Sequence, residues 1–171
     1  MRRLALAVLW APLACAVLVS FAFADGLETH FGPGERLEPI DVAALGGAQR
    51  TIEMAAYILT DVPVIEALTA AALRGVKVRI FRQIEDHAPS ARVASALDAL
   101  ERAGAQTQYK LPGSPLMHLK AYCVDGTLLR VGAANFSHSG LTEQDNDLEI
   151  ERGPGVCGPF EADFEALWSG R

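Results

Sequence analysis

Residues 39–110 alternate three times between a helical and an extended pattern, and this alternation constrains the fold more than any other feature of the sequence. Asp61 and Ser90 precede two of the helical segments as caps, and Gly75 and Gly104 follow them. Helices that connect successive strands imply that those strands pair in parallel. We therefore expect an α/β fold in which a mixed, largely parallel β-sheet is sandwiched by helices. The expected helices span residues 39–47, 61–74 and 90–102, and the expected strands span 51–57, 76–81 and 105–110.

Residues 1–24 have the organisation of a secretory signal peptide. Two arginines form a basic head, a long apolar run follows, and small residues precede Asp25. We therefore expect export to a secreted or periplasmic location, with residues 25–171 forming one folded domain. The alternative is an uncleaved segment that anchors the protein, since about 20 apolar residues can span a bilayer.

The charge balance argues against a broad basic surface. The chain has 15 Lys and Arg and 21 Asp and Glu, which give a formal net charge of −6. Without residues 1–24 two arginines are lost and no acid is lost, so 13 basic and 21 acidic residues leave a net charge of −8. Proteins that bind nucleic acid passively rely on an extended basic face. A phosphodiester would therefore be handled here at a focused, local site.

Cys123 and Cys157 are the cysteines that follow the expected signal peptide. In an exported protein they either form one disulfide or stay as two buried thiols. The sequence has no paired CxxC and no HExxH motif. We therefore expect no metal site and no cofactor.

The second half of the chain favours a β-hairpin. Two apolar runs, 116–124 and 128–132, flank Asp125-Gly126-Thr127, and Asp-Gly is a strong hairpin signal because both residues tolerate a positive φ. With a two-residue loop, Val124 faces Thr127. A strand over 145–151 and a helix over 159–168 complete the expected elements, and residues 25–38 are expected to form a loop.

This register gathers three polar side chains. Alternation places His118 and Lys120 on one face of the hairpin, with Asn135 one diagonal step away, whereas Cys123 points to the other face. An imidazole can attack phosphorus or move a proton. An ammonium group and an amide can bind phosphoryl oxygens. The trio therefore indicates chemistry on a phosphate.

The same residues fit a longer pattern, HxK(x)4D(x)6GxxN, which resembles the signature of the phospholipase D superfamily. The matching positions are His118, Lys120, Asp125, Gly132 and Asn135. The segments that begin at Phe31, Ile52 and Arg74 are similar to the small single-motif members, which include secreted bacterial endonucleases and the mitochondrial cardiolipin hydrolase type. The resemblance covers nearly the whole chain after residue 24.

The resemblance implies a homodimer, because members use two copies of the motif and this chain has one. It implies that one His118 forms a phosphohistidine while the partner's His118 serves as acid and base, without a metal. Lys120 and Asn135 would hold the phosphoryl oxygens, and Ser137 either donates to phosphate or shapes the turn. Asp125 would support the turn. Asp145 stands where the family often has a Glu that bonds the catalytic histidine, and it is one methylene shorter.

The expected function is thus an exported, metal-independent phosphodiesterase, with nucleic acid as the first substrate class (an endonuclease). The alternative is a phospholipase D that acts on phosphatidylcholine or other phospholipids, for which residues 111–117 (LPGSPLM) would contact the membrane. A further alternative is a non-catalytic dimeric binding module. Tyr57 either reaches the site or packs in the core, and Arg82 and Arg130 are expected on the solvated surface.

Overall fold

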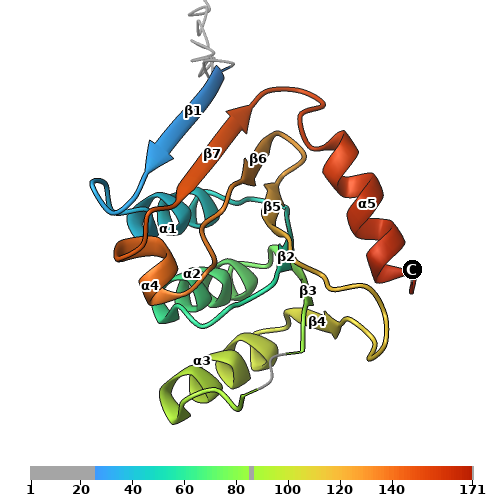
Figure 1. Ribbon diagram of the computed structural model, residues 1–171. Coiled ribbons are helices and arrows are strands. Elements are labelled where there is room, and N and C mark those ends of the chain that lie inside the picture. The colour runs from blue at the N-terminus through green and yellow to red at the C-terminus, as the bar shows by residue number, and fades with distance from the viewer. Residues whose placement is uncertain (1–25, 85–86, 171) are drawn as a thin grey trace, which may run out of the picture.

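The computed structural model describes residues 26–84 and 87–170, so the expected signal peptide lies outside the described residues. A seven-stranded sheet with the order β1-β7-β6-β5-β2-β3-β4 forms its centre (Figure 1). Helices α1, α2 and α3 pack on one face of the sheet and α5 on the other. The strands are β1 (Gly26–Phe31), β2 (Thr51–Ala56), β3 (Lys77–Arg82), β4 (Gln106–Tyr109), β5 (Lys120–Val124), β6 (Leu128–Val131) and β7 (Asp147–Arg152). The helices are α1 (Glu38–Gly46), α2 (Val62–Leu73), α3 (Ala91–Arg102), α4 (His138–Thr142) and α5 (Gly158–Trp168). Within the described ranges, no helix has the length and apolar character needed to cross a membrane.

The sheet is mixed, as expected, but parallel pairing is confined to β2, β3 and β4. The other four strand pairs are antiparallel, so the expected predominance of parallel pairing is wrong. The crossover helices α2 and α3 keep the first strands parallel, whereas the chain after β4 returns through a hairpin and the short α4, which reverse its direction. β1 lies in the segment 25–38, which was expected to be a loop because it is rich in Gly, Pro and charged residues; pairing with β7 makes it a strand instead.

The hairpin between β5 and β6 forms as predicted, but its register differs by one residue. Asp125 and Gly126 both have positive φ, at 55° and 74°. Thr127 belongs to the loop, and its N–H donates to the Val124 carbonyl at 3.1 Å, so Val124 faces Leu128 instead of Thr127. The loop therefore has three residues instead of the two that were predicted.

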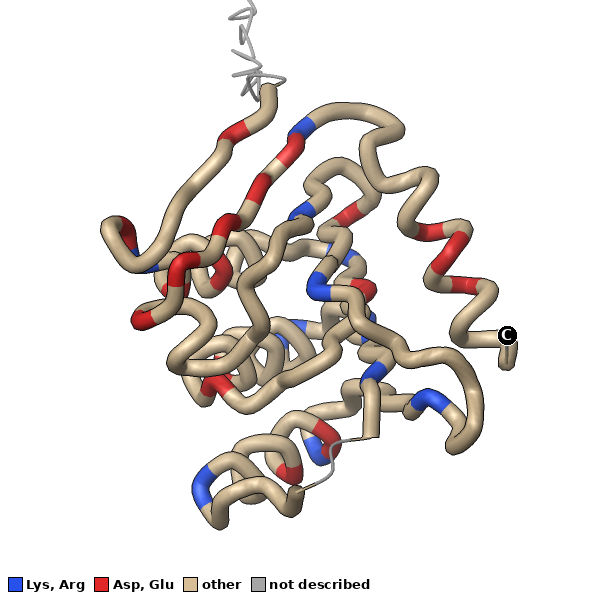
Figure 2. The backbone as a smooth tube through the Cα atoms, viewed as in Figure 1, with Lys and Arg blue, Asp and Glu red and all other residues tan. Residues whose placement is uncertain are grey.

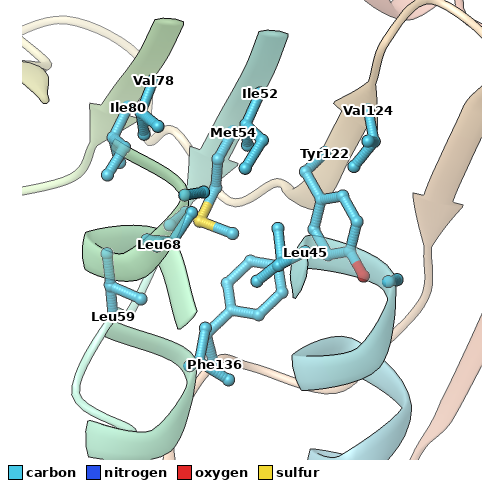
Figure 3. Close-up of a cluster of buried hydrophobic side chains, with 14 of the residues drawn as sticks. Leu45, Ile52, Met54, Leu59, Leu68, Val78, Ile80, Tyr122, Val124 and Phe136 are labelled. Atoms are coloured by element: carbon cyan, nitrogen blue, oxygen red, sulfur yellow. The ribbon is translucent and has the colours of Figure 1, made fainter. Parts of the chain in front are cut away.

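The main core lies between the sheet and helices α1 and α2. Figure 3 shows Met54 and Tyr122 on the sheet pointing toward Leu45 of α1 and toward Phe136, which lies in the segment after β6. Phe136 is fully buried, and burial of a Phe side chain stabilises a fold by about 1.5–3 kcal/mol. Phe136 therefore fixes the backbone position of its neighbour Asn135.

A smaller cluster and a disulfide attach α5 to the other face. Phe164 of α5 packs with Phe81 of the sheet, and Arg79 forms ion pairs with Glu53 and with Glu165 of α5. Cys123 and Cys157 form a disulfide, so the two-thiol alternative does not apply. The bond joins β5 to the residue before α5. Cys123 thus faces away from the main core, as predicted.

Candidate active site

His118 and Lys120 lie together where β5 begins. The Lys120 ammonium donates to the His118 carbonyl oxygen at 2.7 Å, and its Nζ lies 3.0 Å from His118 Nδ1. His118 is exposed, whereas Lys120 is only 8% exposed. Burial, followed by the nearby charge of Arg130, lowers the pKa of Lys120 below its ordinary value. A partly dehydrated cation thus lies directly beside an accessible imidazole.

Tyr57, the residue after β2, lies against both groups. The ring centroids of Tyr57 and His118 are 4.4 Å apart, and Lys120 Nζ lies 5.0 Å from the Tyr57 centroid. The Tyr57 N–H donates to the Leu119 carbonyl at 2.8 Å, which holds the two chain segments side by side. Tyr57 was expected either to reach the site or to pack in the core. The structure places it at the site, where its ring contacts His118 and Lys120.

Arg130 is the residue whose role the sequence did not reveal. It is fully buried, although it was expected on the surface, and it makes a two-point ion pair with Asp41 at 3.0 and 3.1 Å. Its remaining donors reach the carbonyl oxygens of Lys120 at 2.8 Å and Ala134 at 3.2 Å. Arg82 is also buried and donates to the Leu59 carbonyl at 3.3 Å. Arg130 therefore ties the start of β5 to the residue before Asn135.

Asn135 reaches the site because the chain bends sharply after β6. Gly132 has a φ of +152°, and a Cβ there would lie 2.5 Å from the Asp147 carbonyl oxygen, so only glycine fits. Asn135 is half-buried, and its Oδ1 is buried without a hydrogen-bond partner. His118, Lys120, Gly132 and Asn135 line one open pocket of about 450 Å³. The three residues that alternation was expected to bring together thus meet, although the bend and not the strand register places Asn135.

Asp125 lies outside this pocket, at the hairpin loop. Its carboxylate accepts hydrogen bonds from the backbone N–H groups of Gln49, Arg50 and Thr51 at 2.9, 2.7 and 2.9 Å. Burial alone would raise the pKa of Asp125, but these three donors and the Arg50 charge hold the pKa below its ordinary value. The geometry gives Asp125 a structural position that fixes the start of β2.

Ser137 and Asp145 lie between Asn135 and β7, and Asp147 is the first residue of β7. Ser137 caps α4, where its Oγ accepts from the Gly140 N–H at 3.2 Å. Asp145 is exposed and, among the described residues, makes no hydrogen bond or ion pair with His118 or any other group. Asp147 accepts from the Ala133 N–H at 3.3 Å. The acidic side chain that contacts the bend before Asn135 is therefore that of Asp147.

Comparison with known proteins accounts for this arrangement. The family described as "Cardiolipin synthase, PLD-like domain" matches residues 42–168, which include all the motif positions. The chain belongs to the phospholipase D superfamily. Its mixed sheet with flanking helices is also that of a solved phospholipase D family member, Nuc from Salmonella typhimurium, with a TM-score of 0.76 and 24% identity. That likeness covers 85% of this chain and 96% of Nuc.

Two curated relatives bear the name of mitochondrial cardiolipin hydrolase, which describes hydrolysis of a phospholipid. The protein from Danio rerio is 26% identical over 157 residues, and the one from Chlamydomonas reinhardtii is 26% identical over 124 residues. These matches cover 92% and 72% of this chain. The chain spans 62% and 54% of the length of these two relatives.

Proposed function

We propose that this member of the superfamily is an exported phosphodiesterase that works without a metal through a phosphohistidine. The observation that carries the proposal is the convergence of His118, Lys120 and Asn135 on one open pocket. An accessible imidazole can attack phosphorus, while a poorly hydrated ammonium and an amide can stabilise the charge that develops on the phosphoryl oxygens.

The proposed enzyme is a homodimer in which two copies of the pocket face each other. One His118 attacks phosphorus, a histidine–phosphorus bond forms, and the bond from phosphorus to the leaving oxygen breaks. The partner's His118 gives its proton to that oxygen, so the leaving group departs as a neutral alcohol. The partner's His118 then takes a proton from water, whose oxygen attacks phosphorus and releases the first imidazole. Lys120 and Asn135 of both chains bind the non-bridging oxygens throughout.

Nucleic acid is the proposed first substrate class. The pocket is open, and His118, Lys120 and Asn135 are its polar side chains, which suits one phosphodiester of a long, solvated strand. Acidic residues lie along β7 and α5 (Figure 2). Binding of a nucleic acid would therefore depend on local cations rather than on an extended basic face. The signal-peptide pattern of residues 1–24 and the Cys123–Cys157 disulfide support an exported location, because disulfides persist in oxidising compartments.

Phospholipid is the second candidate substrate, and one observation favours it. Leu111, Leu116 and Leu119 are exposed by 65%, 61% and 39%, and the last two line a pocket together with His118. Exposed leucines beside a reactive group would insert into the headgroup region of a bilayer. The names of the cardiolipin hydrolase relatives are consistent with this alternative.

One experiment separates these possibilities. The purified protein is incubated in EDTA with single- and double-stranded DNA, with RNA, and with vesicles of phosphatidylcholine or cardiolipin, and the products are quantified. We expect cleavage of nucleic acid, and we expect His118→Asn to lower the rate by at least about a thousandfold, because it removes the nucleophile.

His87→Asn is the matched control, because His87 is exposed in the loop before α3. This variant should cleave the substrate at the parent's rate. Release of a lipid headgroup while nucleic acid stays intact would make the protein a phospholipase. A folded His118→Asn variant that acts as well as the parent on every substrate would refute the phosphohistidine. Binding of a substrate by both proteins with no turnover would indicate a non-catalytic module.

A further inference from the structure

Three side chains of types that can ligate a metal meet at the N-terminal ends of α1, α2 and α4, although they come from distant parts of the sequence. Glu38 is the first residue of α1, Asp61 caps α2, and His138 is the first residue of α4. One ligand atom from each lies within 4.8 Å of the other two. The sequence motifs for metal sites do not include this arrangement, because the three residues have no short spacing.

Asp61 gives an independent reason to look for a ligand here. It is 1% exposed, and its Oδ1 accepts from the Val64 N–H at 3.1 Å, but its Oδ2 is buried without any partner. A buried carboxylate oxygen without a hydrogen bond is costly. A bound cation would satisfy the free oxygen and offset the clustering of negative charge.

The existing partners of the other two groups do not compete strongly. Glu38, whose side chain is 14% exposed, pairs at 3.1 Å with Arg36, whose side chain is 63% exposed, so solvent reaches this pair from the arginine side. His138 Nε2 lies 3.8 Å from Glu143 Oε1, and both of these side chains are largely exposed. Exposed ion pairs contribute only about 0–1 kcal/mol. Both side chains can therefore turn toward a metal at little cost.

We propose that Glu38, Asp61 and His138 bind one divalent transition-metal ion, with zinc as the ion that fits best. Two carboxylates and one imidazole form a mixed oxygen and nitrogen donor set, which suits zinc, whereas calcium and magnesium prefer oxygen alone. Ligand atoms around a tetrahedral zinc lie about 3.4 Å apart, given bonds of about 2.1 Å. Because the His138 side chain is exposed, it can move closer to the two carboxylates and bring the ligand atoms to this spacing. Water would complete the coordination.

The metal would act on the stability of the site and not on its chemistry. The Phe136 carbonyl oxygen already accepts from the N–H groups of Thr60 and Asp61 at 2.8 and 2.9 Å, so the segment after Asn135 rests on the start of α2. A metal that joins α1, α2 and α4 would hold this segment more firmly. The inference is thus independent of whether the pocket at His118 is catalytic.

The test measures zinc binding and thermal unfolding. The purified protein is stripped with a chelator, dialysed, and titrated with zinc, manganese or magnesium chloride in a calorimeter. We expect one zinc ion per chain, a rise in Tm on binding, and no response to magnesium. Asp61→Asn, which retains a cap oxygen for the Val64 N–H, and His138→Asn should each weaken zinc binding by at least about tenfold.

His87→Asn and His118→Asn are the controls, and both should bind zinc with the affinity of the parent. Absence of zinc binding by the folded parent would refute the site. So would zinc binding that Asp61→Asn and His138→Asn leave unchanged. Loss of binding in His118→Asn alone would place the metal in the pocket and overturn the proposal. None of these outcomes depends on turnover, so failure of the proposed function would leave this test intact.

Discussion

Lys120 illustrates how a single residue at this site is shaped by what surrounds it. Its ammonium is nearly buried, with the His118 carbonyl oxygen at 2.7 Å and the Tyr57 ring on another side. Charges interact more strongly where water is partly excluded, so such a cation binds a phosphoryl oxygen more tightly than a solvated lysine would. Desolvation also lowers its pKa, which is the cost of this position.

Arg130 should prove essential for holding that lysine in place, and Arg130→Lys tests this. One ammonium cannot make the two-point pair with Asp41 and also reach the carbonyl oxygens of Lys120 and Ala134. We expect a loss of about 2–4 kcal/mol in the free energy of unfolding, since a buried ion pair is broken. We also expect at least about a tenfold loss of turnover at a temperature where the variant is folded.

Arg92→Lys on the exposed face of α3 is the matched substitution and should change neither quantity. Urea unfolding gives the stability and initial rates give the turnover. A folded Arg130→Lys protein with the parent's rate would contradict a positioning role, even if its stability were lower.

The residue scale also shows what sequence reasoning could reach. The spacing of His118, Lys120 and Asn135 pointed to one site, and the structure brings them to one pocket. Both Arg130 and Asp41 stand among apolar residues, but the two lie 89 positions apart, so nothing in the sequence showed that they pair. Tertiary ion pairs between distant residues leave no periodic trace in a sequence.

At the scale of elements, the hairpin loop is held by one carboxylate. Asp125 accepts three backbone N–H groups at the start of β2, and its folded pKa is depressed. A depressed pKa means that the stabilisation is present above the unfolded pKa of about 3.9 and is lost as the pH falls through the folded pKa. This element should therefore weaken only in acid, below about pH 4.

Asp125→Asn should remove about 1–3 kcal/mol from the free energy of unfolding at pH 7, because an amide offers one acceptor oxygen in place of two and carries no charge. Asparagine tolerates the positive φ of 55° at this position, so the loop should persist. The difference from the parent should shrink below pH 4 when unfolding is followed at several pH values. Asp98→Asn on exposed α3 serves as the comparison. A pH-independent difference would contradict the role of the charge.

Elements with a strong local signal were predictable, and elements defined by distant partners were not. Asp61 and Ser90 cap α2 and α3 as expected, because a cap acts within its own turn. β1 was missed because the strand it pairs with, β7, lies more than a hundred residues away in the sequence. The hairpin register shifted by one because nothing local to Thr127 decides whether it joins the loop or the strand.

On the scale of the whole molecule, the two faces of the sheet are fixed by different means. Packing against α1 and α2 covers one face with the larger apolar core. The other face has a smaller cluster under α5, the ion pairs of Arg79 and the disulfide between β5 and the start of α5. A covalent link is most useful where the apolar core is small, since it limits the freedom of the unfolded chain. The fold around the pocket therefore does not depend on one core alone.

The proposed dimer has one shared site, and this arrangement can be tested by mixing subunits. If each site needs His118 from both chains, a dimer with one His118→Asn subunit is inactive. Equal amounts of parent and variant, refolded together, should then retain about one quarter of the activity of the same total amount of parent, because one dimer in four has two intact subunits. Independent subunits would retain about one half. Parent refolded with His87→Asn should lose nothing, and sedimentation of the mixtures checks that dimers have formed. If a dimeric mixture retained one half of the parent's activity, each chain would work alone, and the two-histidine mechanism would be refuted.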